Sequence, residues 1–369
     1  MGSTFSNRIA KARQQMATTN VDALCLSVGA DLPYLTGYSA MPLERLTMLV
    51  LRQDGEARLV IPELEASLVT ETSDFELVPW GETADPLDLV VGMLGGANKV
   101  AIGETTWARF LVGLIERAPS LDFCNAGVVM TPLRAVKSAE EIAVLRSAAH
   151  AVDRIAGRLQ SGEIPLVGQT EAQVSAELGR QIEAEGHYKV NFAIVAAGEN
   201  AASPHHHAGS RVIKENEVVL CDFGGTMAGD DGVGYCSDLT RCVYTGEPSA
   251  EFAEMYAVLL EAQTASLAAA KAGTAAEDVD RAGRSIIEAA GYGEYFIHRT
   301  GHGIGVEAHE EPYIVEGNSD PLVAGNAFSI EPGIYIPGKF GARIEDIVVA
   351  GETAADPLNV VDHNLAVVS

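Results

Sequence analysis

The sequence is short of basic residues. It has 25 Lys and Arg against 51 Asp and Glu, so the 369-residue chain carries a formal charge of −26. No cluster of Lys and Arg forms a local exception to this balance. Nucleic acids and anionic lipid surfaces repel such a protein. We therefore expect neither as a partner, and expect the excess acid to serve solubility or to be neutralised in part by bound metal.

The sequence also lacks long apolar runs and an ordered cysteine pattern. No run approaches the roughly 18 apolar residues that cross a bilayer, and no apolar signal core follows the first residues. The cysteines are irregularly spaced and contain no Cys-x-x-Cys pair: Cys25, Cys124, Cys221, Cys236 and Cys242. Buried, reduced thiols in a cytoplasmic protein are the expectation.

The length predicts two domains, because ~150 residues per domain is usual. Residues 1–130 are expected to form a smaller α/β domain, in which Asp54-Gly55 between two apolar segments predicts a β-hairpin. The helices expected there span 6–16 and 88–94, and the strands span 21–28, 46–51, 57–61, 75–78 and 99–102. Residues 121–136 are interpreted as the connection to the second domain.

Residues 131–369 are expected to form an α+β domain. Ser138 with Glu141 and Thr170 with Gln173 have the spacing of capping boxes, which predicts helices from 138 to about 159 and from 170 to about 186. Further helices are expected over 250–271 and 276–290, and strands over 192–196, 218–223, 238–244, 327–330 and 343–350. These elements come in blocks rather than in strict alternation, which favours α+β.

Four carboxylates of this half stand within or beside apolar strand patterns: Asp222, Asp238, Glu331 and Glu345. An unpaired buried carboxylate costs several kcal/mol, so such acids are normally ion-paired or bound to metal. Nearby basic residues are too few to pair them all, since Arg241 and Arg343 could neutralise only two. A metal site would account for the whole set.

Six of the nine histidines gather in two short segments of the same half: His205, His206, His207, His298, His302 and His309. Gly301 and Gly303 flank His302, which suits close backbone packing around a ligand. A single histidine is usually structural or solvated, but this clustering favours a site.

Four carboxylates and one imidazole form a hard, oxygen-rich donor set. Such a set favours Mn²⁺, with Co²⁺ and Zn²⁺ as competitors. Two dications would cancel the four negative charges. Two-metal sites generate hydroxide at neutral pH and polarise a carbonyl, so the sequence predicts hydrolysis of an acyl bond.

The order of these motifs resembles the pita-bread metallopeptidases, a family that includes methionine aminopeptidase, aminopeptidase P, prolidase and creatinase. The resemblance runs from about residue 133 to the C-terminus, and residues 22–24 and 34–37 are similar to the creatinase-type N-terminal domain. Methionine aminopeptidases generally lack that domain, so the resemblance implies the proline-specific branch. It implies hydrolysis of the Xaa-Pro bond in dipeptides or at peptide N-termini by a metal-bridging hydroxide, and a homodimer.

The resemblance assigns five metal ligands. One ion would be chelated by Asp222, and the other would be held by His302 and Glu331. Both ions would be bridged by Asp238 and Glu345.

The resemblance also assigns the groups that handle substrate. His205 and His309 would be the catalytic histidines, and His298 and Tyr335 would form part of the substrate pocket. Arg343 and Tyr335 would also support the metal ligands from behind.

The sequence departs from the family pattern at two places. Asp222 and Asp238 are 16 positions apart (238 − 222), and residues 228–234 have the character of an insertion. Asp238 is preferred to Asp231 as the ligand because residues 235–241 match the family strand, and Asp230 and Asp231 are expected to be solvated. Tyr313 stands where some prolidases carry an arginine, so dipeptidase and aminopeptidase P both stay open.

Two other functions stay open as alternatives. One is a metallohydrolase of the same fold that acts on a non-proline amide, and the other is a metal-free binding protein that uses the pita-bread cleft. Creatinase has the fold without the metal set, whereas all five ligand positions are filled here. The complete set favours the peptidase.

Overall fold

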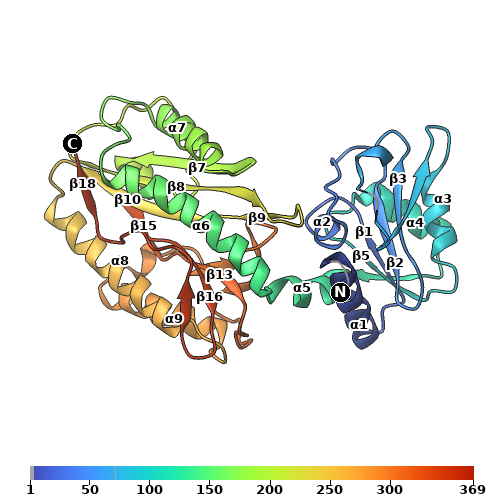
Figure 1. The fold of residues 1–369 in the computed structure, drawn as a ribbon. Coiled ribbons are helices and arrows are strands. Elements are labelled where there is room, and N and C mark those ends of the chain that lie inside the picture. The colour runs from blue at the N-terminus through green and yellow to red at the C-terminus, as the bar shows by residue number, and fades with distance from the viewer. Residues whose placement is uncertain (1–3, 71) are drawn as a thin grey trace. The chain divides into compact units, whose positions relative to one another are not determined.

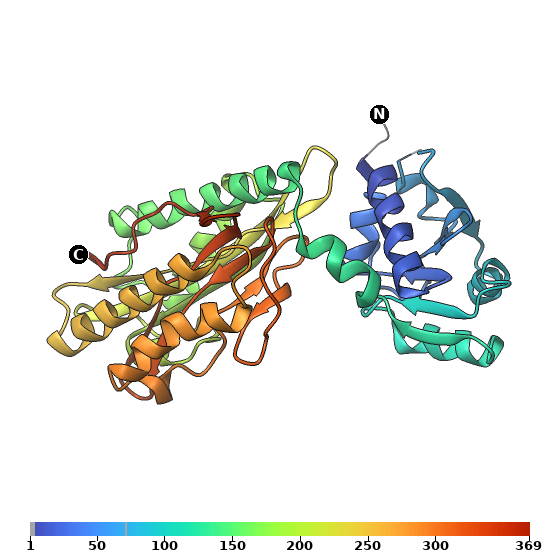
Figure 2. The same ribbon diagram turned by 90° about the horizontal axis from the view of Figure 1, so that it is seen from below.

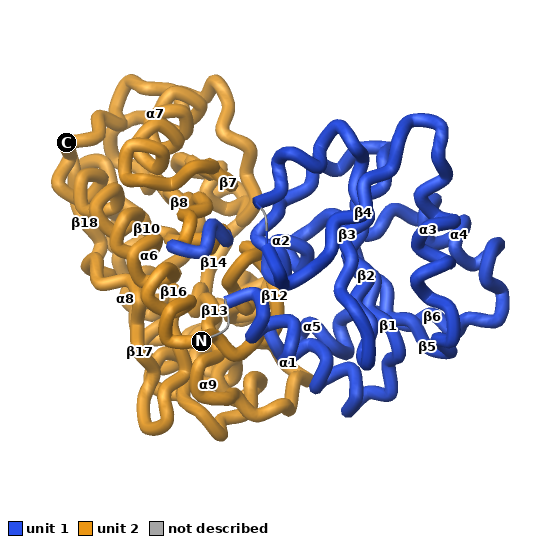
Figure 3. Tube along the Cα trace, turned by 45° about the vertical axis from the view of Figure 1, so that its right-hand side comes forward, with its two compact units in different colours: residues 1–134, 230–233 blue, residues 135–229, 234–369 orange. Residues whose placement is uncertain are grey.

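The computed structural model describes residues 4–70 and 72–369. The chain divides into two compact units, coloured in Figure 3. Unit 1 comprises Met1–Arg134 with Asp230–Val233, and unit 2 comprises Ala135–Gly229 with Gly234–Ser369. The four residues of unit 1 that come from the later part of the chain lie inside the predicted insertion.

Unit 1 is built on a mixed sheet with the strand order β4-β3-β2-β1-β5-β6. Its strands are β1 (Ala23–Leu26), β2 (Met48–Arg52), β3 (Ala57–Pro62), β4 (Glu76–Trp80), β5 (Lys99–Ile102) and β6 (Asp122–Asn125). Its helices are α1 (Thr4–Thr19), α2 (Asp31–Thr36), η1 (Ala66–Leu68), α3 (Pro86–Met93), α4 (Ala108–Arg117) and α5 (Gly127–Ala135). Strands β2 and β3 are antiparallel around Asp54-Gly55, so the predicted hairpin is confirmed.

The interpretation of residues 121–136 as a plain connection is wrong. Strand β6 pairs in parallel with β5, and helix α5 follows it. Strand β6 is a four-residue edge strand with no fully buried side chain, so it has no apolar pattern that sequence analysis could detect.

Unit 2 contains two long helix pairs and three short sheets. Its helices are α6 (Ala139–Gln160), α7 (Glu171–Ala184), η2 (Gly198–Ala202), α8 (Ala250–Ala269), α9 (Ala276–Ala289) and η3 (Gly293–Tyr295). Both predicted capping boxes are confirmed. The Ser138 hydroxyl accepts from the Glu141 amide and the Glu141 carboxylate accepts from the Ser138 amide, and Thr170 and Gln173 do the same.

The first sheet of unit 2 has the order β18-β10-β8-β7, with β9 paired to β8, and the second has the order β12-β11-β13-β16-β17. A hairpin of β14 and β15 forms the third. The strands are β7 (Lys189–Ala197), β8 (Glu217–Ala228), β9 (Gly234–Cys236), β10 (Leu239–Thr245), β11 (Gly301–Gly303), β12 (Glu310–Ile314), β13 (Ala327–Ile330), β14 (Gly333–Ile336), β15 (Phe340–Arg343), β16 (Asp346–Ala350), β17 (Ala355–Pro357) and β18 (Ala366–Val368).

Helices cover these sheets on opposite sides, as Figures 1 and 2 show for α6 and α7 in green and for α8 and α9 in orange. Alternate side chains of β8 follow the same division. Val219 and Phe223 pack in the core under α6 and α7, whereas Val218 and Leu220 pack with residues of α8 and of the β14–β15 hairpin. With a period of two, Asp222 belongs to the Val218 and Leu220 face, between the layers.

The single strand predicted over 343–350 is two strands. Strand β15 ends at Arg343, β16 begins at Asp346, and Glu345 between them forms a bridge to Thr240 of β10. Glu345 thus stands at a junction where the chain passes from the hairpin into the second sheet, next to the first sheet. None of the helices within residues 4–70 and 72–369 has the length and apolar character to cross a membrane.

Candidate metal centre and substrate pocket

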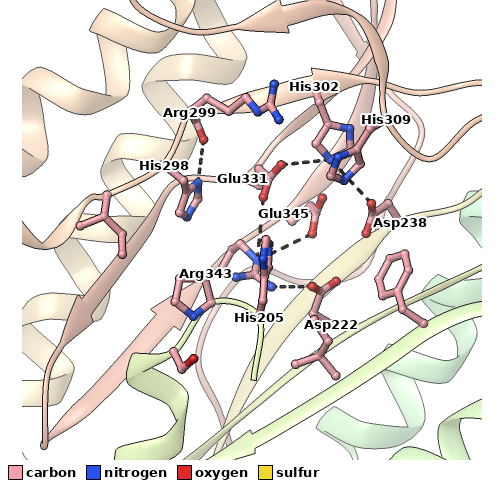
Figure 4. Close-up of a pocket in the computed structure, with 15 residues that line it drawn as sticks. His205, Asp222, Asp238, His298, Arg299, His302, His309, Glu331, Arg343 and Glu345 are labelled. Carbon is pink, nitrogen blue, oxygen red and sulfur yellow. Dashed lines mark hydrogen bonds and ion pairs between the residues drawn. The ribbon is translucent and has the colours of Figure 1, made fainter. Parts of the chain in front are cut away.

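The five predicted metal ligands line one cavity of about 530 Å³ in unit 2 (Figure 4). Two of them lie within strands, Asp222 in the middle of β8 and His302 in β11, and three lie next to a strand end: Asp238 just before β10, Glu331 just after β13 and Glu345 just before β16. Both main sheets therefore contribute, and segments up to 123 residues apart (345 − 222) meet in one cavity. His205, His298, His309 and Arg343 line the same cavity.

The carboxylates of the cavity are withdrawn from water. Asp222, Asp238 and Glu345 have exposed fractions of 7%, 4% and 2%. Burial raises the pKa of Asp238 well above its usual range, and the neighbouring Glu345 raises it further. Burial also raises the pKa of Glu345 well above its usual range, with Glu331 adding to the effect. Without added positive charge, these acids favour the protonated form.

The guanidinium of Arg343 lies close to these acids. Arg343 Nη2 lies 2.5 Å from Asp222 Oδ2, and Arg343 Nε lies 3.9 Å from Glu345 Oε2. Burial raises the pKa of Asp222 in spite of the opposing charge of Arg343. Arg241, the other candidate partner, instead forms a fully buried ion pair with Asp346 at 2.7 Å.

The residues present fit divalent cations. Asp222 Oδ1 is buried and has no hydrogen-bond partner among residues 4–70 and 72–369, which is costly for a carboxylate oxygen unless a ligand meets it. Asp238, His302 and Glu345 each offer a donor atom, and these atoms lie within 4.8 Å of one another. Oxygen donors with one imidazole suit Mn²⁺, Co²⁺ or Zn²⁺.

His302 presents one ring nitrogen to the carboxylates. Its Nδ1 lies 3.1 Å from the carbonyl oxygen of Gly303, which can only accept, so Nδ1 carries the proton. Its Nε2 lies 3.2 Å from Glu331 Oε1 and 3.8 Å from Asp238 Oδ2. A backbone-anchored Nδ1–H that leaves Nε2 without a proton is the usual arrangement of a metal-binding histidine.

The glycines beside His302 are required by close packing of the backbone. A Cβ atom on Gly301 would lie 1.8 Å from the carbonyl oxygen of Ser329, and one on Gly303 would lie 2.3 Å from the backbone of Glu311. The backbone is closely packed at these glycines, but against the neighbouring strands, whereas the sequence predicted close packing around a ligand. This packing holds His302 in the second sheet.

His298, Tyr335 and Arg343 form a hydrogen-bonded chain. Arg343 Nη1 donates to the Tyr335 hydroxyl at 2.7 Å, and that hydroxyl lies 2.9 Å from His298 Nε2. His298 Nδ1 lies 2.7 Å from the carbonyl oxygen of Arg299, so Nδ1 donates and Nε2 accepts. Both ring nitrogens of His298 are therefore engaged, and its exposed part is an apolar ring surface.

Tyr335 has an exposed fraction of 2% and is not among the residues that line the cavity. Its hydroxyl lies behind His298. This position favours the predicted supporting role of Tyr335, through Arg343 and His298, over the predicted direct contact with substrate.

The ring of His309 packs against that of the candidate ligand His302, with 3.9 Å between ring centroids and an angle of 32° between the ring planes. Burial and, next, the charge of His302 lower the pKa of His309 to about 4. The His309 imidazole is therefore neutral near pH 7 and can donate one N–H.

Glu171 is a residue of the site that sequence analysis missed. Its fully buried carboxylate accepts from the Ala197 amide and the Asn200 side chain, both at 2.9 Å, and from His206 Nε2 at 2.8 Å. It thereby holds the segment that presents His205 to the cavity. In the sequence, Glu171 is marked only by its position just after the N-cap Thr170. An acidic residue there is usually explained by its favourable interaction with the positive end of the helix dipole.

The predicted insertion lies outside the metal centre. Asp231 Oδ2 forms an ion pair with Arg8 Nη1 at 3.1 Å, within unit 1. Asp230 is exposed, as predicted, whereas the prediction that Asp231 is solvated is wrong. All five cysteines are free, in agreement with the expected reduced thiols.

Comparisons with known proteins extend over the whole chain. The model of metallopeptidase family M24 matches residues 143–352, and that of the creatinase/prolidase N-terminal domain matches residues 8–136. The probable dipeptidase PepE of Mycobacterium tuberculosis is 42% identical over 369 residues, which cover 99% of this chain and 96% of the relative.

Two solved structures have the same fold. Dipeptidase PepE from Mycobacterium ulcerans is 42% identical, with a TM-score of 0.92 over 99% of this chain and 98% of the other. A prolidase from Thermococcus sibiricus is 34% identical, with a TM-score of 0.92 over the full length of both chains. The chain is therefore a metallopeptidase of family M24, with a creatinase-type N-terminal domain and a pita-bread catalytic domain.

Proposed function

We propose that this metallopeptidase binds two divalent metal ions and hydrolyses the peptide bond that precedes proline. The observation that carries the proposal is the meeting of four carboxylates and the Nε2 of His302 in one cavity, where Asp222 Oδ1 has no hydrogen-bond partner among the described residues. Asp222, Asp238, His302, Glu331 and Glu345 would hold the ions. Bound there, the ions would supply a hydroxide at neutral pH and polarise the scissile carbonyl.

The histidines around the cavity support the proposed chemistry. His309 is neutral near pH 7 and packs against a ligand, so its N–H can donate to the oxyanion that develops on the carbonyl. His205 lines the same cavity on a segment held by Glu171, and can contact the tetrahedral intermediate. Arg343 holds Asp222 and lies near Glu345, so it orients two ligands at once.

The walls of the cavity suit a proline ring. A bond before proline is a tertiary amide without an N–H, so a pocket must recognise the ring rather than the backbone. Phe192, Ile194 and Ile297 line the cavity with the apolar face of His298. The names of the relatives, dipeptidase and prolidase, agree with a small proline-containing substrate.

The test compares the purified protein on Ala-Pro and Ala-Ala, each with its metal content measured by elemental analysis before and after chelation. Two bound ions per chain and Ala-Pro hydrolysis far above Ala-Ala hydrolysis are expected. Equal rates with full metal loading would favour the alternative of a general metallohydrolase. Absence of bound metal after supplementation, with a peptide still bound, would favour a metal-free binding protein.

Three finer properties belong to the same proposal. We propose Mn²⁺ as the preferred ion, because the donor set has four carboxylates, with Co²⁺ or Zn²⁺ as alternatives. A homodimer follows from the family resemblance, and light scattering coupled to gel filtration tests it. A cytoplasmic location agrees with five free thiols, and fractionation of the source cells tests it.

A further inference from the structure

The two acids proposed to bridge the ions, Asp238 and Glu345, are both tied to strand β10. Asp238 lies just before β10, and Glu345 lies between β15 and β16, where it forms a bridge to Thr240 of β10. Both acids line the same cavity, as Figure 4 shows. Strand β10 therefore follows one bridging acid directly and contacts the other through Thr240.

Thr240 and its neighbour Arg241 hold Glu345 through both backbone and side chain. The Glu345 amide donates to the carbonyl oxygen of Thr240 at 3.3 Å, and the Glu345 carbonyl oxygen accepts from Arg241 Nη1 at 2.7 Å. The Thr240 hydroxyl donates to the Glu345 carboxylate at 2.6 Å. The position of Glu345 relative to β10, and hence to Asp238, depends on these contacts.

Arg241 is itself held by every donor of its side chain. The side chain is buried, and its N–H groups donate at 2.7–3.0 Å to the carbonyl oxygens of Thr240, Glu345, Val361 and Asp362 and to the Asp346 carboxylate. That set uses all the N–H bonds that a guanidinium offers. A planar guanidinium presents its donors in fixed directions, whereas a lysine presents its donors from one nitrogen. A lysine could therefore replace the charge but not this set of contacts.

The segment of residues 358–363 fixes the start of β16. His363 Nε2 lies 2.5 Å from Asp346 Oδ2, and Asn359 Oδ1 accepts from the Ile347 amide at 2.8 Å. The segment also supplies two of the carbonyl oxygens that meet the guanidinium. The described residues that line the cavity include none of these groups, so the network acts on the bridging acid rather than on substrate.

We propose that Arg241 is a positioning residue that sets the separation of the bridging acids Asp238 and Glu345, and that residues 358–363 hold Arg241 in place. The inference rests on the proposed function, because it concerns the proposed metal ions. Partners behind a metal ligand typically contribute about 10- to 100-fold to metal affinity or activity. Because the network does not reach the substrate pocket, substrate binding should be spared.

The experiment titrates Co²⁺ into the metal-free protein, followed by visible absorption, and then measures kcat and KM on the dipeptide that wild type cleaves fastest. Arg241→Lys keeps the charge beside Asp346 but loses the fixed set of donors. We expect about 10- to 100-fold weaker Co²⁺ binding, an altered Co²⁺ spectrum and a similar fall in kcat. The KM should stay within about twofold of wild type.

A second pair of variants tests the same network from its edge. The His363 side chain is 28% exposed, so its substitution should leave the fold intact. His363→Ala removes one donor to Asp346, and should alter the Co²⁺ spectrum and lower kcat by about threefold or more. His363→Gln keeps an N–H donor in nearly the same place and should restore both. If Arg241→Lys does not fold, this pair decides the case.

A control separates positioning from stability. Val368→Ala removes a buried apolar contact near the same end of the chain, so it should lower Tm and leave Co²⁺ binding and kcat unchanged. All measurements are made well below the Tm of each variant. If Arg241→Lys and His363→Ala behave as Val368→Ala does, the network is only structural and the proposal is overturned.

Failure of the proposed function gives a different result from failure of this inference. If wild type binds no Co²⁺, the proposed metal centre is refuted, and the inference with it. If wild type and the variants of Arg241 and His363 all bind Co²⁺ with the same affinity and spectrum, the metal centre stands and only the positioning role is refuted.

Discussion

At the scale of single residues, Glu345 is the acid whose charge matters most. It is buried, its pKa is raised by burial and by Glu331, and its Oε2 accepts from the Thr240 hydroxyl at 2.6 Å. Glu345→Gln keeps the size and the acceptor for Thr240 but removes the charge that two ions would share. We expect a folded protein that loses at least one metal ion and nearly all hydrolysis.

Elemental analysis, circular dichroism and the rate on Ala-Pro check this expectation together. The matched control is Glu352→Gln, because Glu352 is an exposed acid a few residues further along the chain. Two bound ions with ordinary turnover in Glu345→Gln would contradict the assignment of Glu345 as a ligand.

Substitutions of the adjacent histidines His302 and His309 should have different effects on metal binding and on the rate. His302→Ala removes the unprotonated Nε2 that faces Glu331 and Asp238, so metal should be lost. His309→Ala should keep the metal and slow the chemical step, since one preorganised donor is worth ~2.7–4 kcal/mol in comparable sites. Metal titration and single-turnover rates distinguish the variants, and matching titration curves would refute the division of roles.

At the scale of elements, the segment from η2 to Gly209 depends on Glu171. Its carboxylate only accepts, and four donors converge on it, from Ala197, Asn200, His206 and Gly209. Glu171→Gln turns one acceptor into a donor that faces donors. We expect a lower Tm and at least tenfold slower hydrolysis, with both metal ions retained.

Glu177→Gln serves as the control for Glu171, because Glu177 lies on the same helix and is solvated, with Arg180 and Gln181 as partners. Its activity and Tm should match wild type. Loss of metal from Glu171→Gln would mean that Glu171 supports the ligands rather than the segment of His205.

The loop between β8 and β9 contains Asp231, and substitutions can test whether Asp231 or Asp238 is the metal ligand. Asp231 pairs with Arg8 within unit 1, with side-chain exposures of 19% and 8%, so breaking this pair would lower the stability of unit 1 rather than disturb the metal centre of unit 2. Asp231→Asn should therefore keep metal and activity, whereas Asp238→Asn should abolish both. Elemental analysis and Ala-Pro assays of the two variants check this, and the reverse pattern would move the ligand to Asp231.

At the scale of the whole molecule, metal should stabilise the fold. Binding to the native state alone contributes about 2.7 kcal/mol when the free ion is about 100 times its Kd. Removal of the metal also leaves the four carboxylates close together in one cavity, where the guanidinium of Arg343 pairs with Asp222. We expect Tm to fall on chelation and to recover with added Mn²⁺, as followed by calorimetry. The response should be smaller in Glu345→Gln, and an unchanged Tm after complete removal of metal would contradict the site.

Local signals in the sequence were enough for much of the architecture. Capping boxes at Ser138 and Thr170 and the turn at Asp54-Gly55 act through neighbouring residues, so they predict helix starts and a hairpin without tertiary information. Residues 121–136 were misread because β6 is stabilised by pairing with β5 rather than by its own apolar pattern.

The sequence by itself also determined which residues make the candidate centre, because acids in apolar strands and a glycine-flanked histidine have a local physical cost that calls for a ligand. Only the tertiary structure decided what depends on distant partners. It placed Tyr335 behind His298, paired Asp231 with Arg8, and fixed the His205 segment on Glu171. Hydrogen bonds and ion pairs of this kind join residues far apart in the chain, and no local spacing records which partner each side chain meets.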